Sequence, residues 1–123
     1  MKILGTGVDL VEVPRFRQVL RRKGDRFLRR LFTPAELAYA RGRRQTLQHL
    51  AARFAAKEAV VKALGAPKGL GLKWTDLEVT NLASGQPRVA FRGTMGRWKK
   101  ARVHLSLTHT DKYAVAAATV CSE

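Results

Sequence analysis

A long helical segment most constrains the fold of this chain. Residues 46–64 are rich in Ala and Leu, contain no Gly or Pro, and are followed by Gly65, a residue typical of helix C-caps. A chain of 123 residues is long enough for one domain with a single modest core. We therefore expect residues 1–123 to form one domain in which this helix is the central element.

The helix carries an unusual group of charged residues. Glu58 and Lys62 are four residues apart and share a helix face, with Lys57 beside them and Arg53 a further turn back. The neighbouring Ala and Val residues add no other polar group. One carboxylate among cations suits a metal ion held against phosphates. The alternative is a surface ion pair between Glu58 and Lys62, worth only about 0.2–0.5 kcal/mol.

A second carboxylate lies in the first predicted strand. Alternation over residues 2–13 places Asp9 on the same face as Gly5 and Gly7. The glycines leave room for a ligand or another backbone to approach, and a carboxylate on an apolar face needs a partner. A structural Asp bonded to a loop is the alternative. Together with Glu58, Asp9 forms a reasonable Mg²⁺ site of the kind that substrate phosphates and water complete.

The remaining segments predict short helices and antiparallel strands, so the expected class is α+β, with an antiparallel sheet packed against the long helix. Helix starts and breaks are marked by Pro, Gly and a capping motif. In the first half of the chain, we expect a strand over 2–13, a helix from Pro14 that breaks at Gly24-Asp25, and a helical piece over 26–32. A helix follows the N-cap Thr33, with Pro34 and Glu36 behind it, and precedes the long helix over 46–64 and a flexible connection over 65–71. In the second half, we expect a strand over 74–80, a turn at Ser84-Gly85, a strand over 87–91, a short helix over 93–101, and strands over 103–109 and 113–120.

The charge indicates a polyanionic partner. Twenty-four Lys and Arg against nine Asp and Glu give a net charge of +15. Nucleic acid, a phosphorylated small molecule and an acidic protein all fit this charge. Arg15 and Arg22 lie seven residues apart and share a helix face, with Arg26 close by. A merely solvated basic face is the alternative for each of them.

The last part of the chain places polar residues on a strand. His104, Ser106, Thr108 and Thr110 share one face, whereas His109 has the opposite parity. No nucleophile elbow surrounds Ser106, and a single distant cysteine does not complete a zinc site. Hydrogen bonds from strand-end residues to a ligand fit better, with structural hydroxyls as the alternative.

The composition also bears on location. Cys121 is the only cysteine, so no disulfide forms within the chain. No apolar run approaches the roughly 18–20 residues of a membrane span, and the N-terminus lacks a signal-peptide pattern. We expect a cytoplasmic protein without a membrane partner.

Five sequence blocks in order resemble the holo-acyl-carrier-protein synthases, the small bacterial type of 4′-phosphopantetheinyl transferase. The resemblance covers nearly the whole chain, and the order and spacing of the blocks make it specific. The blocks are residues 5–12, 32–37, 53–65, 74–79 and 104–109.

The resemblance implies a Mg²⁺-dependent enzyme of fatty acid biosynthesis. Such an enzyme transfers 4′-phosphopantetheine from coenzyme A to a serine of apo acyl carrier protein and releases adenosine 3′,5′-bisphosphate. Asp9 and Glu58 match the Mg²⁺ ligands and Lys62 matches a phosphate-contacting lysine; these three are the expected catalytic residues. The base that accepts the serine proton is Glu58 or a metal-bound water on this hypothesis. The implied coenzyme A contacts are Arg53, Lys62, Gly65, His109 and Thr110.

The resemblance also implies macromolecular partners. Arg15, Arg22 and Arg26 match the region of the first helix that meets the acidic carrier protein. Members of this family are typically homotrimers with active sites at the subunit interfaces, and on that pattern Asp9 and Glu58 come from the same subunit.

Two other functions remain as alternatives. A non-catalytic RNA- or DNA-binding module would explain the charge, but aromatic residues make up only 7% of the chain and no ribonucleoprotein motif is present. An inactive relative that only binds coenzyme A is the other alternative, against which the intact Asp9, Glu58 and Lys62 argue. We therefore expect no nucleic acid partner.

Overall fold

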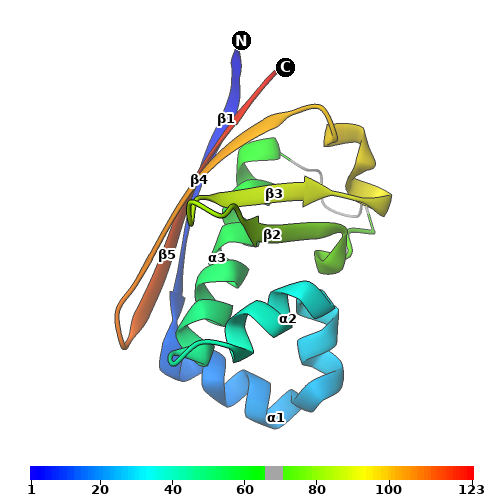
Figure 1. Cartoon of the computed structure of the whole chain (residues 1–123). Helices are drawn as coiled ribbons and strands as arrows, with labels where there is room; N and C mark the ends of the chain where they lie inside the picture. The colour runs from blue at the N-terminus through cyan, green and yellow to red at the C-terminus, as the bar shows by residue number, and fades with distance from the viewer. Residues whose placement is uncertain (66–70) are drawn as a thin grey trace.

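The computed structural model describes residues 1–65 and 71–123. A three-stranded sheet and a separate two-stranded hairpin surround one long helix (Figure 1), which confirms the predicted α+β class. The elements are β1 (Ile3–Glu12), α1 (Val13–Leu31), α2 (Pro34–Arg41), α3 (Thr46–Leu64), the 3₁₀ helix η1 (Trp74–Asp76), β2 (Leu77–Asn81), β3 (Pro87–Phe91), the 3₁₀ helix η2 (Gly93–Trp98), β4 (Arg102–His109) and β5 (Tyr113–Cys121).

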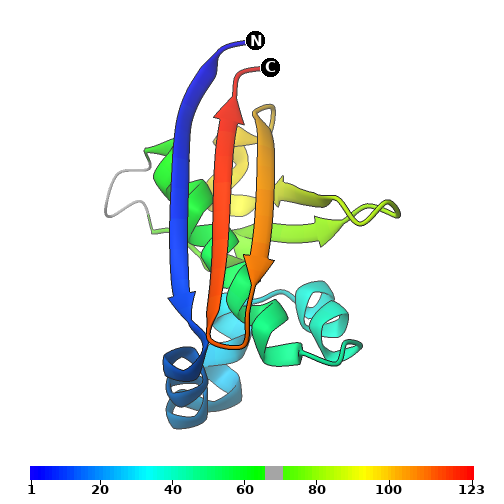
Figure 2. The ribbon, with the colours of Figure 1, turned by 90° about the vertical axis from the view of Figure 1, so that its left-hand side faces the viewer.

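The larger sheet is antiparallel throughout, in the order β1-β5-β4. Figure 2 shows these three strands side by side with α3 behind them, so one face of the sheet packs on the helix and the other has no helix over it. Side chains alternate between the two faces as predicted, and the small residues Ala114, Ala116 and Ala118 of β5 are buried towards α3. The central helix is therefore the common neighbour of the sheet and of α2.

The glycines of β1 allow its backbone to lie directly on α3. A Cβ atom on Gly5 would lie 2.0 Å from the carbonyl oxygen of Ala63, and one on Gly7 would lie 2.0 Å from that of Ala59. No real Cβ atom occupies such a position, so only glycine fits at either site. Of the two sequence-based alternatives, the structure shows the approach of another backbone.

Helix boundaries follow the local sequence signals. Gly24 takes a left-handed φ of 77° and interrupts α1 at the predicted position. Thr33 and Glu36 form a reciprocal capping box at the start of α2, and Gly65 ends α3 with a φ of 61°. The first strand, the Gly85 turn and strands β3, β4 and β5 also lie close to their predicted positions.

Two expected elements differ from the structure. The strand expected over 74–80 begins only at Leu77, because Trp74–Asp76 forms a 3₁₀ turn. The Asp76 carboxylate accepts hydrogen bonds from the backbone N–H and the hydroxyl of Thr94, at 3.0 and 2.8 Å, which holds this turn against η2. The helix expected over 93–101 is a 3₁₀ helix that ends at Trp98. Most of the expected flexible connection, residues 66–70, lies outside the described residues.

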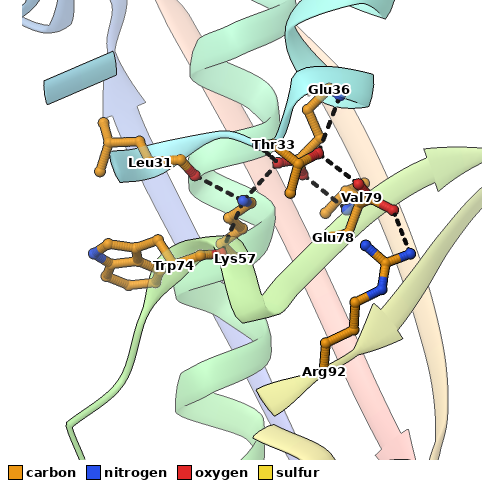
Figure 3. Close-up of polar contacts among 8 residues, drawn as sticks. All are labelled: Leu31, Thr33, Glu36, Lys57, Trp74, Glu78, Val79 and Arg92. Atoms are coloured by element: carbon orange, nitrogen blue, oxygen red, sulfur yellow. Dashed lines mark hydrogen bonds and ion pairs between the residues drawn. The ribbon is translucent and has the colours of Figure 1, made fainter. Parts of the chain in front are cut away.

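Lys57 does not join Glu58 on a polar helix face, which corrects the grouping made from the sequence. Its side chain is fully buried on the side of α3 that faces α2, where its ammonium nitrogen lies 2.7 Å from Glu36 Oε1 (Figure 3). The same nitrogen donates to the carbonyl oxygens of Leu31 and Trp74, at 2.7 and 3.0 Å. All three ammonium protons thus have acceptors, which compensates for the loss of hydration.

The partner carboxylate extends this network across the core. Glu36 accepts a hydrogen bond from the backbone N–H of Thr33 with one oxygen and from that of Val79 with the other, each at 2.8 Å. The Thr33 hydroxyl donates to Glu78, which is paired with Arg92 at 3.0 Å (Figure 3). Polar contacts in one buried cluster therefore join α1, α2, α3, η1 and the hairpin.

Lys57→Met should destabilise the fold by about 3–5 kcal/mol, because it leaves the Glu36 carboxylate buried without its cation. Urea unfolding measures the loss. The double variant Lys57→Met/Glu36→Gln removes the orphaned charge and keeps one acceptor oxygen for the two backbone N–H groups, so it should be more stable than Lys57→Met alone. Equal or lower stability of the double variant would contradict this account.

Gly7→Ala should also be destabilising, by at least about 1–3 kcal/mol, because the new Cβ must push β1 away from α3. Gly96→Ala is the matched control, since a Cβ there meets no atom within 4 Å and its φ is not positive. The control should stay within about 0.5 kcal/mol of the parent in the same unfolding assay. Similar losses in both variants would argue against the close strand–helix contact.

Candidate active site

Asp9, Glu58 and Lys62 come together where β1 crosses α3. Lys62 Nζ lies 2.9 Å from Asp9 Oδ1 and 3.1 Å from the carbonyl oxygen of Val8. The Lys62 side chain is 55% exposed and that of Asp9 13%, so the carboxylate lies below a solvated ammonium group. Lys62 forms its ion pair with Asp9. Among the described residues, Glu58 therefore forms no ion pair with Lys62, and the Asp9 carboxylate binds this lysine and no loop.

The electrostatics of this site oppose a second negative charge. Burial raises the pKa of Glu58, the Asp9 charge raises it further, and Lys62 only partly offsets them. The hydrogen bond to Asp9 raises the pKa of Lys62, which keeps the ammonium charged. The protein therefore holds two carboxylates close enough to repel each other, with one cation shared between them.

These residues fit a magnesium ion. Mg²⁺ prefers hard oxygen ligands and keeps several waters, so one or two carboxylates plus substrate phosphates suffice to bind it. A divalent cation beside Asp9 and Glu58 would relieve the repulsion that raises the Glu58 pKa. Among the described residues, no three or more His, Cys, Asp or Glu side chains are grouped so that they could hold a metal ion by themselves.

Arg53 and His109 lie in a different pocket, on the side of α3 away from Lys62. Arg53 and Lys62 are nine residues apart, about two and a half helical turns, which places them on opposite sides of the helix. The pocket has a volume of about 230 Å³. Neither Asp9, Glu58 nor Lys62 lines it; its walls are Tyr39, His49, Ala52, Arg53, Asn81, Gly85, Pro87, Leu107 and His109.

The guanidinium of Arg53 forms the base of this pocket. The residue is only 2% exposed, one terminal nitrogen donates to the side-chain oxygen of Asn81, and its Nε has no hydrogen-bond partner among the described residues. Burial lowers the pKa of Arg53. His109 follows the strict alternation of β4 and faces inward, towards His49, at 5.2 Å between ring centroids. The sequence did not reveal His49, Tyr39 or Asn81, because elements distant in sequence bring them here.

The structure gives Gly65 and Thr110 local roles. Gly65 donates its backbone N–H to the last turn of α3. The Thr110 hydroxyl accepts hydrogen bonds from the N–H groups of Lys112 and Tyr113, at 3.3 and 3.1 Å, and so stabilises the turn between β4 and β5. Ligand contacts of these two residues stay predictions.

An apolar hollow lies between α1 and α3, next to Glu58. Its volume is about 390 Å³, and its charged lining residues are Glu12, Arg15 and Glu58. Arg22 and Arg26 are exposed on α1, one on each side of the break at Gly24. The sequence indicated the arginines but not the hollow, because its walls come from β1, α1 and α3: Leu10, Val11, Phe16, Val19, Phe27, Leu31 and Phe54.

Comparisons with known proteins identify the relatives of this chain. The family model of the 4′-phosphopantetheinyl transferase superfamily matches residues 5–118. The holo-[acyl-carrier-protein] synthase of Koribacter versatilis is 46% identical over 94% of this chain and 95% of its own length. That of Desulforudis audaxviator is 51% identical over 94% of this chain and 91% of its own length.

Solved structures agree with the sequence relatives. A holo-(acyl-carrier-protein) synthase from Bacillus anthracis, in complex with CoA (3′,5′-ADP), superposes with a TM-score of 0.83 at 32% identity and full coverage of both chains. The enzyme from Neisseria meningitidis gives a TM-score of 0.84 at 28% identity, over 96% of this chain and 98% of its own. Fold, sequence and family model agree over almost the whole length, and the chain belongs to the holo-[acyl-carrier-protein] synthase family of the 4′-phosphopantetheinyl transferase superfamily.

Proposed function

We propose that the chain transfers the 4′-phosphopantetheine arm of coenzyme A to a serine of apo acyl carrier protein, for fatty acid biosynthesis. The observation that carries the proposal is the Asp9–Lys62–Glu58 group, built on the strand–helix contact of a chain that belongs to this family. A nucleic-acid-binding module would have no use for two carboxylates held together at a cationic surface.

The chain's own residues account for the chemistry. Asp9 and Glu58 would hold Mg²⁺, which supplies positive charge to the diphosphate of coenzyme A. Lys62, charged and more than half exposed, is placed to contact the phosphate oxygens as charge develops on them. We assign to Glu58 the role of candidate base for the serine hydroxyl, since it is the carboxylate that lies beside Asp9 and Lys62 at this site. A pH–rate profile left unchanged by Glu58→Gln would rule this out.

The nucleotide end of coenzyme A fits the pocket around Arg53 and His109. This pocket is cationic and contains an unpartnered buried guanidinium nitrogen, a ready donor for a phosphate or a base edge. In one chain it faces away from Lys62, so a single coenzyme A molecule would meet both parts more readily if a second copy supplied one of them.

A homotrimer would provide that second copy. The sheet face that no described helix covers exposes several large apolar side chains, which favours burial against another surface (Figure 2). The exposed apolar residues of β1 and β5 are Ile3, Leu4, Val8, Leu10 and Tyr113. A cytoplasmic location stays a prediction; no described helix is long and apolar enough to cross a membrane.

The acidic carrier protein would dock on α1. Arg15 lies on the rim of the apolar hollow that leads to Glu58, so a carrier placed there would bring its serine towards the metal site. The net charge of +15 would speed this encounter and make it sensitive to salt.

The decisive experiment incubates the protein with Mg²⁺, coenzyme A and an apo carrier protein, and measures the mass of the carrier. We expect a gain of one phosphopantetheine arm, and none with Asp9→Ala. No gain with several carriers would defeat the proposal.

Light scattering on the same sample should give the mass of three 13.7 kDa chains, and a fully active monomer would contradict the trimer.

Glu58→Gln should raise Tm at pH 7 when a chelator removes divalent ions. In the folded protein, the pKa of Glu58 lies above the 4.5 of a free glutamate. The protonated carboxyl group therefore stabilises the fold below pH 4.5, and this contribution is lost as the pH rises through the folded-state pKa. A neutral amide avoids that loss at pH 7. Magnesium should raise Tm of the parent more than that of the variant. Glu123→Gln, at the exposed C-terminus, is the control; its Tm in chelator and its response to magnesium should both match those of the parent. A lower Tm for Glu58→Gln in chelator would contradict the electrostatic account.

Arg15→Glu should raise KM for the carrier protein several-fold while KM for coenzyme A changes little, because Arg15 lies at the hollow and not in the nucleotide pocket. Steady-state kinetics with each substrate varied in turn gives both constants. An equal effect on the two would remove the docking assignment.

A further inference from the structure

Four basic groups gather at the nucleotide pocket. His49 and Arg53 of α3 and His109 of β4 line it, and Arg43 from the α2–α3 connection stacks on Tyr39 in its wall. The Arg43 guanidinium carbon lies 3.4 Å and that of Arg53 3.9 Å from the centre of the Tyr39 ring. Both guanidinium groups therefore stack on the same tyrosine ring. His49 meets the edge of the same ring at 5.9 Å, and His109 lies 5.2 Å from His49.

This cluster has no negative partner among the described residues. The ion pairs among the described residues use Lys57, Lys62 and Arg92, and none involves Arg43, Arg53, His49 or His109. Among the described residues, the Arg53 guanidinium donates to the neutral side-chain oxygen of Asn81 and its Nε has no hydrogen-bond partner, and the Glu36 charge acts on Arg53 without forming an ion pair. A cluster of basic groups at a cavity wall without a carboxylate is suited to an anionic ligand.

His49 occupies the centre of the cluster. It faces Tyr39 from α2, Arg43 from the α2–α3 connection, Arg53 one turn further along α3, and His109 from β4. Burial lowers the pKa of His49, and the charges of His109, Arg53 and Arg43 lower it further. These effects favour the neutral imidazole in the free protein. An anion bound among the same residues would offset their positive charge and so favour the protonated form of His49.

We propose that His49 is a phosphate-binding residue of this chain, and that it takes up one proton from solvent when the phosphate monoester of a nucleotide enters the pocket. The imidazolium then donates an N–H to a phosphate oxygen, next to His109 and the two arginines. The proton leaves a buffer acid and forms the second N–H bond of the His49 ring, and no other covalent bond changes. The inference rests on the proposed function, because it takes this pocket as the site for the nucleotide of coenzyme A.

Nucleotide binding and protonation of His49 are coupled on this proposal, so the affinity for the nucleotide depends on pH. Because the complex holds more protons than the free protein, affinity falls as pH rises between the free and bound pKa values of His49, by up to about tenfold per pH unit. The phosphate group itself titrates near pH 6, so the useful range lies above about pH 6.5.

The test is isothermal titration calorimetry of adenosine 3′,5′-bisphosphate with the full chain at pH 6.5–8.5, in buffers of different ionisation enthalpy. The parent should take up a proton on binding, and its Kd should rise with pH. His49→Asn should bind more weakly at the low end of the range, with little proton uptake and a flatter pH dependence. His104→Asn removes the exposed histidine on the opposite face of β4 and should behave as the parent.

Several results would overturn the inference. These are an unchanged pH dependence in His49→Asn, an equal flattening in His104→Asn, or failure of the parent to bind the nucleotide while it still modifies the carrier. The last result would leave the proposed function intact. Conversely, proton-linked binding without any transfer would defeat the proposed function and leave this inference standing. If His49→Asn does not fold, NMR titration of the parent decides, since the pKa of His49 must be higher in the complex than in the free protein.

Discussion

The contact between the backbones of β1 and α3 is the constraint on which the rest of the structure depends. Gly5 and Gly7 leave no side chain between the strand and the helix, and the carbonyl oxygens of Ala63 and Ala59 occupy the space where Cβ atoms would lie. This close approach brings Asp9 on the strand to Glu58 and Lys62 on the helix. The candidate metal site is therefore a consequence of how the main chain packs, more than of the charged residues alone.

The polar residues of α3 serve three separate purposes. Glu58 and Lys62 face β1, Arg53 faces the pocket that it lines together with His109, and Lys57 is buried with Glu36. The buried pair ties the helix to α2 and to the hairpin, and so fixes the rotation of α3 about its axis. Because a helix has one rotation, fixing Lys57 also fixes where the other three side chains point.

Much of the fold follows from local sequence signals. The break at Gly24, the capping box of Thr33 and Glu36, the end of α3 at Gly65 and the strand alternation are all encoded within a few residues, and each appears in the structure. The 3₁₀ turn before β2 was not predictable in this way, because it depends on hydrogen bonds that Thr94, 18 residues further along the chain, donates to the Asp76 carboxylate.

The sequence by itself determined most of the elements, the family and the Asp9, Glu58 and Lys62 candidates, since these depend on short-range spacing and on ordered motifs. Only the tertiary structure decided that Lys57 is a core residue, that Lys62 pairs with Asp9, and that His49 joins Arg53 and His109. The physical reason is that charge and spacing specify what a side chain can do. Which partner it meets depends on the packing of segments far apart in the chain.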